Sequence, residues 1–319
     1  MLWLKRWDFL AKLAPSRGIL RRGRIAKIRE ELTVLRPGGL GDVVLLTRAC
    51  LELGSSPQSI FWILERRNAP WADYLGLPHR CYDNANTFWQ AIAGRERARI
   101  VVNSEQTFGL ASVFASRVVS PQGLLIGFSS NSRADLYDRV ITYDYEKHES
   151  AMFGALLKSA QTEIQLEAAS SFHLPDAAPP PSTPFAVIAI AGRQASEKQI
   201  SLSAWKELVS RARSYADDVY FVGSKIDERF ATDLAHSCKA TVQNLVGKLS
   251  FREVVALIRN ATRLLSVDSG LVHIADFFSI PSDVVFTTSS PKKWGPTTAG
   301  SEVLSIDKVG EGFITEAQR

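Results

Sequence analysis

Four short segments of the 319-residue chain carry glycine, hydroxyl or charged side chains where an apolar run gives way to a polar stretch. The first, residues 36–42, has the sequence Arg-Pro-Gly-Gly-Leu-Gly-Asp. Glycines between a strand and a helix allow backbone N–H groups to approach a ligand closely. No Gly-Lys-Ser/Thr follows, as a Walker A loop requires, and a dinucleotide fingerprint starting at Gly39 would need glycine where Val44 stands. The segment is therefore a glycine-lined turn that presents one carboxylate, Asp42.

Two roles suit Asp42. It could cap the helix that we expect over residues 43–53, because aspartate is a favoured N-cap residue. It could also act as a general base toward a substrate hydroxyl. Taken alone, the segment favours the cap.

The second segment, residues 265–275, runs from a buried strand through Asp-Ser-Gly into a helix. Backbone N–H groups, a hydroxyl and an imidazole around one helix N-terminus form an anion site. In the alternative, Asp268 or Ser269 caps the helix and His273 is a core residue. The candidate binding residues are Asp268, Ser269, Gly270 and His273.

Two further loops follow expected strands in the second half of the chain. The loop 192–198 carries Arg193 and Lys198, which would suit a diphosphate, although a solvated surface loop is the alternative. Asp227 and Glu228 follow the apolar run 219–223. Either acid could bind ribose hydroxyls, or both could simply complement the dipole of the next helix.

The chain offers no framework for a metal. It contains no Asp-x-Asp, no His/Asp/Glu cluster with ligand spacing, and three cysteines, Cys50, Cys81 and Cys238, that lie far apart. We expect no metal and no other cofactor. If the substrate is a sugar nucleotide, protein cations must stabilise the departing diphosphate. Sparse cysteine and the lack of a secretory signal pattern favour a cytoplasmic location.

Apolar runs alternate with helical patterns on both sides of the proline-rich segment 175–184, which holds five prolines. This alternation predicts an α/β fold with a doubly wound parallel sheet in each half. We assign residues 30–174 and 185–319 to two Rossmann-like domains, joined by that linker and facing a central cleft. Ligands bind at the carboxyl ends of strands in such sheets. Expected strands are 32–35, 59–64, 99–102, 124–128, 185–191, 219–223, 263–267 and 283–286; expected helices are 43–53, 148–160, 202–215, 227–238 and 251–260.

The net charge of +5 resides at the N-terminus. Residues 1–29 contain nine Lys or Arg and one acid, so this arm carries +8 and the rest of the chain −3. Residues 2–14 form a tryptophan-bearing apolar face flanked by cations, as in helices that lie on membranes. Such an arm, residues 1–24, would bind an anionic membrane surface; the alternative is a helix packed on the protein. A nucleic-acid partner is disfavoured because the remaining chain is slightly acidic. No apolar run reaches the roughly 18 residues of a membrane span.

Together these segments resemble one family. Residues 38–45, Gly-Gly-Leu-Gly-Asp-Val-Val-Leu, resemble the N-terminal signature of glycosyltransferase family 9, the lipopolysaccharide heptosyltransferases. Residues 245–251 resemble its middle motif, and residues 268–275 with Pro281 and 294–296 resemble its C-terminal Asp-Ser-Gly-x-x-His-x-Ala signature. The motifs occur in the family's order between residues 33 and 296. The chain departs from the family at 270–273, where Gly-Leu-Val-His replaces Gly-Pro-Met-His, and at Asp276, where a small residue is common.

The resemblance implies a GT-B fold with the donor in the C-terminal domain and the acceptor mainly in the N-terminal one. It implies an inverting, metal-independent transfer of a sugar, heptose from ADP-heptose, onto a lipopolysaccharide core acceptor at the cytoplasmic membrane face. It makes Asp42 the base, Lys198 the diphosphate partner and Asp268 a donor-sugar contact. The alternatives are another GT-B sugar-nucleotide enzyme, such as an epimerase, or a catalytically silent nucleotide-sugar-binding protein. The other implied contacts are Arg193, Asp227 or Glu228, Ser269, Gly270 and His273 for the donor, and Gly39, Gly41 and Glu105 on the acceptor side.

Overall fold

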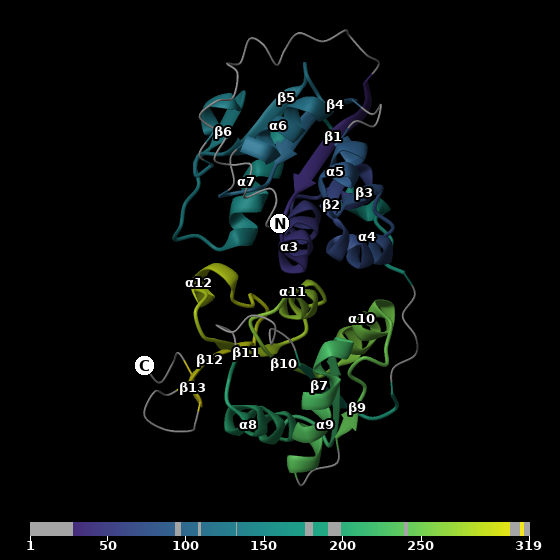
Figure 1. The fold of residues 1–319 in the computed structure, drawn as a ribbon, viewed down its shortest axis with the longest axis vertical. Coiled ribbons are helices and arrows are strands. Elements are labelled where there is room, and N and C mark those ends of the chain that lie inside the picture. The colour runs from purple at the N-terminus through teal and green to yellow at the C-terminus, as the bar shows by residue number, and fades with distance from the viewer. Residues whose placement is uncertain are drawn as a thin grey trace. The chain divides into compact units, whose positions relative to one another are not determined.

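The computed structural model describes residues 28–92, 97–107, 110–131, 133–175, 181–190, 199–238, 242–306 and 313–315 (Figure 1). The chain divides between Pro175 and Asp176 into two compact units. Three predicted features lie outside the described residues: the basic arm 1–24, Arg193 and Lys198.

The first unit contains a six-stranded sheet with the order β3-β2-β1-β4-β5-β6. All its pairings are parallel; for example, Val34 of β1 lies beside Trp62 of β2 and Val102 of β4. This order, with β1 central, is that of a Rossmann-like fold. The strands are β1 (Ile28–Arg36), β2 (Phe61–Glu65), β3 (His79–Tyr82), β4 (Arg97–Asn103), β5 (Leu124–Phe128) and β6 (Arg139–Ile141).

The helices of this unit cover the sheet in pairs. Helix α3 packs against α7, and α5 packs against α6. A buried cluster joins Leu35 of β1 and Val101 of β4 to Val113 of α6, so the core lies between the sheet and its helices. The helices are α3 (Leu40–Glu52), α4 (Ala69–Leu75), α5 (Ala85–Ile92), α6 (Leu110–Val119) and α7 (Glu149–Gln161).

The second unit contains a seven-stranded sheet with the order β13-β12-β11-β10-β7-β8-β9. If β7 to β12 are numbered one to six, their order in this sheet is the same as that of β1 to β6 in the first sheet. The expectation of a wholly parallel sheet is wrong at one edge, because β13 (Phe313–Thr315) pairs antiparallel with β12 (Glu302–Ile306). The other strands are β7 (Phe185–Ile190), β8 (Asp218–Gly223), β9 (Gln243–Asn244), β10 (Arg263–Val267) and β11 (Ser282–Phe286). The helices are α8 (Leu202–Arg213), α9 (Glu228–Ser237), α10 (Phe251–Asn260), α11 (Gly270–Phe277) and α12 (Pro291–Trp294).

Three predicted elements, 124–128, 251–260 and 263–267, have the observed bounds. The predicted helix 43–53 begins earlier, at Leu40, because Gly39 takes the N-cap position. The predicted helix 227–238 begins one residue later, at Glu228, because Asp227 belongs to the short 3-10 turn (Lys225–Asp227) that precedes α9. None of the described helices is both long enough and apolar enough to span a bilayer.

Candidate functional site

The turn between β1 and α3 is short and built around glycine. Gly38 has φ +127°, a conformation that residues with a side chain rarely adopt. Its N–H donates to Glu65 Oε1 (3.2 Å) and its carbonyl accepts from Asn68 Nδ2 (3.1 Å), so the end of β2 and the segment after it fix the turn. Gly41 is the second residue of α3 and is half-buried.

Asp42 occupies the third position of α3 and does not form the N-cap. The N-cap is Gly39, whose N–H donates to Asp42 Oδ2 (3.0 Å). Asp42 therefore supports the helix start from inside the first turn, as the third residue of a capping box does. The prediction that Asp42 itself caps the helix is wrong, because the glycine-rich turn allows the helix to begin two residues before it.

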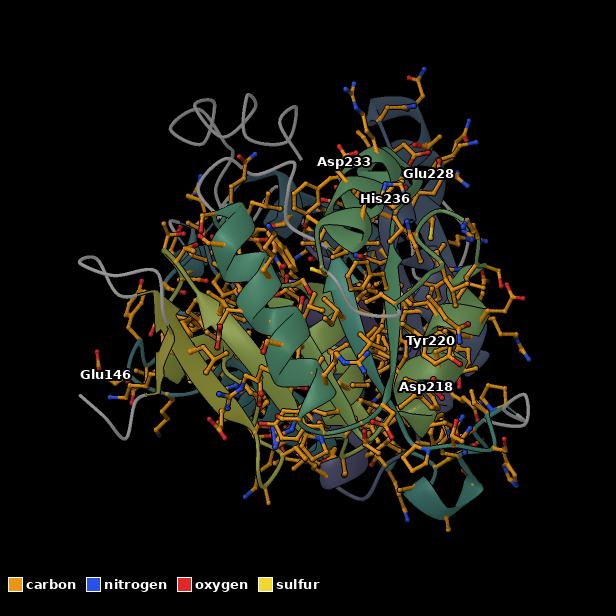
Figure 2. All side chains as sticks on the ribbon, turned by 90° about the horizontal axis from the view of Figure 1, so that it is seen from below. Glu146, Asp218, Tyr220, Glu228, Asp233 and His236 are labelled. Atoms are coloured by element: carbon orange, nitrogen blue, oxygen red, sulfur yellow. The ribbon has the colours of Figure 1, made fainter. Side chains whose placement is uncertain are left out.

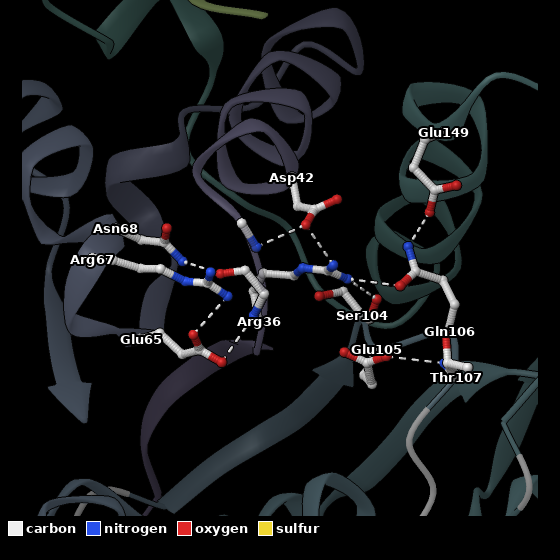
Figure 3. Close-up of polar contacts among 12 residues, drawn as sticks. Arg36, Asp42, Glu65, Arg67, Asn68, Ser104, Glu105, Gln106, Thr107 and Glu149 are labelled. Atoms are coloured by element: carbon white, nitrogen blue, oxygen red, sulfur yellow. Dashed lines mark hydrogen bonds and ion pairs between the residues drawn. The ribbon is translucent and has the colours of Figure 1, made fainter. Parts of the chain in front are cut away.

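A buried arginine holds the same carboxylate oxygen (Figure 3). Arg36 ends β1, its side chain is 4% exposed, and its Nη2 lies 2.7 Å from Asp42 Oδ2. Asp42 Oδ1 makes no hydrogen bond to any described residue, and Figure 3 shows it directed away from the guanidinium. The Asp42 side chain is 13% exposed. One oxygen is thus fixed while the other can accept a proton.

The other terminal nitrogen of Arg36 is also engaged, whereas its buried Nε makes no hydrogen bond to any described residue. Its Nη1 donates to Ser104 O (2.6 Å) and to Gln106 Oε1 (3.1 Å), just past the end of β4. Gln106 Nε2 in turn donates to Oε1 of Glu149, which is fully buried at the start of α7. Tyr143 OH donates to Glu149 Oε2 (2.6 Å). A continuous chain of polar contacts therefore links Asp42 to α7.

Charge explains why the arginine remains a cation. Burial lowers the pKa of Arg36, but Asp42, Glu105 and Glu149 raise it, and the net shift is upward. Glu105 is 2% exposed and its Oε1 accepts from Thr107 N (3.0 Å). Burial and the contact with Glu149 also raise the pKa of Tyr143, which stays neutral.

In the second unit, the residues that we expect to bind an anion lie at the start of α11. Asp268 follows β10, and its Oδ2 accepts from Ser289 Oγ (2.5 Å). Ser269 is the N-cap residue by its backbone, but its side chain makes no capping hydrogen bond, and its Oγ lies 3.2 Å from Ser266 Oγ. The alternative in which the Ser269 side chain caps the helix is therefore wrong, and its role toward a donor stays a prediction. Gly270 opens the helix.

His273 and Asp276 extend this site into the interior. His273 is 4% exposed, and its ring meets the edge of Trp294 with centroids 6.4 Å apart. Asp276, 1% exposed, accepts four hydrogen bonds of 2.5–2.9 Å from the N–H and O–H groups of Thr297 and Thr298. The residue that departs from the family's pattern thus anchors the segment after α12.

The two candidate ribose ligands differ in their surroundings. Asp227 is buried, and its Oδ2 accepts from Ser224 Oγ (2.7 Å) in its own turn. Glu228 is half-buried at the first position of α9, the helix that also carries Asp233 and His236 (Figure 2). The carboxylate of Asp227 is therefore already engaged locally.

The comparisons with known proteins decide the family. Residues 99–311 match glycosyltransferase family 9 (heptosyltransferase). The chain belongs to this family. A stretch of 98 residues is 31% identical to lipooligosaccharide heptosyltransferase 2 of Haemophilus influenzae, covering 31% of this chain and 26% of that protein. The chain thus matches about a quarter of the length of this relative.

Solved structures show the same fold. The family 9 glycosyltransferase of Veillonella parvula superposes with a TM-score of 0.68 at 15% identity, over 89% of this chain and 90% of that one. The heptosyltransferase WaaC of E. coli with ADP gives 0.67 at 17% identity, over 89% and 96%. The E. coli ADP-heptose lps heptosyltransferase II gives 0.63 at 17% identity, over 88% and 92%. The GT-B class predicted from the sequence is confirmed.

The structure groups the predicted site residues by unit. Gly39, Gly41, Asp42 and Glu105 lie where β1 and β4 end, while Asp268, Ser269, Gly270 and His273 lie where β10 ends. A cleft between the two units stays a prediction.

Among the described residues, no group of three or more His, Cys, Asp or Glu side chains is arranged to hold a metal ion. Sequence reasoning gave no role to five residues that shape these sites: Arg36, Gln106, Glu149, Asp276 and Ser289.

The tight turn leaves too little room for a side chain at Gly38. A Cβ there would lie 2.7 Å from Arg36 Nη2 and 3.0 Å from Asp42 Oδ2. Gly38→Ala combines this clash with an unfavourable φ, so we expect it to lower the free energy of unfolding by about 3 kcal/mol. Denaturant unfolding measures the loss.

Gly54→Ala is the matched control. Gly54 has φ +77°, and its Cβ would meet nothing within 4 Å. Gly54→Ala should lower the free energy of unfolding only by the backbone strain, about 1 kcal/mol. Equal losses for the two variants would mean that Gly38 does not pack against the ion pair.

Proposed function

We propose that the protein is an inverting, metal-independent glycosyltransferase that moves a heptose from ADP-heptose onto a lipopolysaccharide core acceptor. The observation that carries the proposal is Asp42, a carboxylate with one oxygen fixed by Arg36 and Gly39 and the other accessible. Membership of family 9 supports the reaction class. The names of the Haemophilus relative and of the E. coli structures support a heptose donor carried on ADP.

In the proposed reaction, an acceptor hydroxyl attacks the anomeric carbon of the donor from the face opposite the diphosphate. The new C–O bond forms as the bond to the diphosphate oxygen breaks, and the single displacement inverts the anomeric centre. Asp42 Oδ1 takes the hydroxyl proton as the nucleophile becomes acidic in the transition state. Nucleoside diphosphate leaves with the bonding electron pair. Gly39, Gly41 and Glu105 would line the acceptor side.

Protein groups would stabilise the departing diphosphate. The N-terminus of α11 at Ser269 and Gly270 provides backbone N–H groups, which favour anions. Lys198 and Arg193 would add positive charge, and Asp268 and His273 would contact the donor nearby. Preorganised charges of this kind are worth most when water is excluded. Glu228 suits the ribose better than Asp227, whose carboxylate already accepts from Ser224.

The donor can be identified with the wild-type protein. We expect ADP-heptose to stabilise it more than ADP-glucose, GDP-mannose or UDP-N-acetylglucosamine in a thermal-shift panel. Ligand at 100 times its dissociation constant adds about 2.7 kcal/mol to stability. A donor that binds without any transfer or hydrolysis would favour a silent binding protein, and a product with an epimerised sugar would favour an epimerase.

Asp42→Asn separates the base from a structural role. Asparagine can still accept from Gly39 N–H, but an amide does not take up the acceptor proton. We expect turnover to fall by roughly 100-fold or more while donor affinity persists. Turnover and donor affinity should be measured on the same preparation.

Asp138→Asn is the matched control. Asp138 pairs with Arg117 Nη2 at 2.8 Å, with side chains 12% and 5% exposed, close to the values for Asp42 and Arg36. This variant should keep wild-type turnover per folded molecule. Near-normal turnover in Asp42→Asn would remove Asp42 from the mechanism and direct attention to Glu105.

Metal independence has its own test. We expect turnover to survive excess EDTA, because protein cations replace the metal that Asp-x-Asp transferases use. Complete loss of turnover in EDTA, restored by Mg²⁺ or Mn²⁺, would contradict the mechanism.

We further propose that the enzyme works at the inner face of the cytoplasmic membrane, where the arm 1–24 contacts anionic lipid. Full-length protein should sediment with vesicles of phosphatidylglycerol, and less so as salt rises. A variant lacking residues 1–24 should stay in solution. Equal binding of both proteins would assign the arm a packing role instead.

A further inference from the structure

We propose that Arg36 is a positioning residue for the transfer reaction: it acts through Asp42 by fixing which carboxylate oxygen meets the acceptor hydroxyl. The inference rests on the proposed function, in which Asp42 is the base. It goes beyond that function because Arg36 itself needs no contact with donor or acceptor.

Two hydrogen-bond donors hold the Asp42 carboxylate by one of its oxygens. Both anchoring contacts, Arg36 Nη2 at 2.7 Å and Gly39 N at 3.0 Å, converge on Oδ2. They come from two sides of the turn, from the end of β1 and from the helix N-cap. Two converging donors fix both the position and the rotation of a carboxylate, so Oδ1 is the oxygen left to face a substrate. A misplacement of about 1 Å in a reacting group can cost roughly 100-fold in rate.

Arg36 is itself held in place by residues from other elements. Its Nη1 donates to Ser104 O and Gln106 Oε1, and its guanidinium lies over the Phe153 ring, 5.4 Å from the centroid. Gln106 is held by Glu149, which Tyr143 holds in turn. The orientation of Asp42 therefore depends on β1, on the segment after β4 and on α7.

Arg36 also balances the charge of the carboxylates around it. Asp42, Glu105 and Glu149 all act electrostatically on the buried Arg36. One cation therefore stands among three carboxylates. Without Arg36, the mutual repulsion of the three carboxylates would displace Asp42, the least buried of them, more easily than Glu105 or Glu149. An arginine fork serves several partners at once, which a lysine ammonium with its point charge does less well.

A purely structural role is the competing explanation, and the chain provides a control for it. Arg117 pairs with Asp138 at nearly the same distance and burial as Arg36 with Asp42. Asp138 accepts from Leu125 N near the start of β5, so this pair lies at the amino end of the parallel strands, opposite the carboxyl end of β1 that carries Arg36. Removing either arginine should destabilise the unit, but only Arg36 adjoins the base.

The experiment compares Arg36→Met, Arg36→Lys and Arg117→Met for turnover, donor dissociation constant and melting temperature. We expect Arg36→Met to lower turnover at least 10-fold with a donor dissociation constant within about 2-fold of wild type. Arg36→Lys should recover part of the turnover. Arg117→Met should lose melting temperature comparably yet keep turnover per folded molecule within about 2-fold.

Two further variants keep the proposal testable if Arg36→Met does not fold. Gln106→Met removes one support of Arg36 without touching the ion pair, and should lower turnover about 3-fold with unchanged donor affinity. Arg36→Ala leaves a space for a guanidinium ion, so guanidinium at low millimolar concentration should raise its turnover several-fold and leave Asp42→Asn unaffected.

The outcomes separate the two proposals. If wild-type protein transfers no sugar and hydrolyses no donor, the proposed function fails. If wild-type protein is active and the Arg36 and Gln106 variants behave like Arg117→Met, the function stands and the positioning role is overturned.

Discussion

A buried guanidinium must be neutralised and hydrogen-bonded, and the first unit is organised around that requirement at Arg36. Moving an isolated charge from water into a protein interior costs several kcal/mol unless partners compensate it. Asp42, Ser104 O and Gln106 provide those partners, and Glu105 and Glu149 add compensating charge. Gly38 is required because any side chain there would displace the guanidinium. The same set of contacts that makes the burial tolerable also leaves Asp42 with one fixed and one accessible oxygen.

The second unit has the same strand order, and its proposed role is to bind an anionic donor. The proposed anionic donor would need N–H groups, and at the β10–α11 turn the N-cap side chain makes no capping hydrogen bond. Asp276 anchors the segment after α12 from within α11 through four hydrogen bonds. Hydrogen bonds from the two threonines help to stabilise this buried carboxylate. Under the proposed function, two repeats of one strand order place the proton acceptor in one unit and the diphosphate-binding groups in the other.

Local sequence rules predicted the elements that local interactions determine. Helix α10 was predicted with its observed bounds because Ser250 and Glu253 form a capping box and its apolar face is regular. The sequence predicts too late a start for α3, because the three glycines within residues 38–41 indicate a turn. Contacts of this turn with Glu65 and Asn68 fix it so that the helix begins at Leu40. Short elements such as α4 and β3 were missed because seven and four residues hold too little periodicity. The family motifs identified Asp42 and Asp268 without showing what holds them.

Polar contacts between residues far apart in the chain could not be predicted from the sequence. Arg36 and Gln106 lie 70 positions apart, and Gln106 and Glu149 lie 43 apart. No spacing rule connects such residues, since the parallel sheet brings the ends of β1 and β4 together only on folding. Asp276 did leave a signal, because an acid within an otherwise apolar helix needs a buried partner. Its partners could not be identified before Thr297 and Thr298 were placed beside it.

The central claim is that Arg36 contributes to turnover through Asp42 and by no other route. A double-mutant cycle on turnover, with Arg36→Met, Asp42→Asn and the combined variant, tests it most directly. Residues that act as one unit are strongly non-additive. The account predicts that the combined variant turns over about as slowly as Asp42→Asn alone, within a factor of about 2. If the two losses multiply, so that the combined variant is at least 10-fold slower than Asp42→Asn, Arg36 acts independently of Asp42 and the account is contradicted.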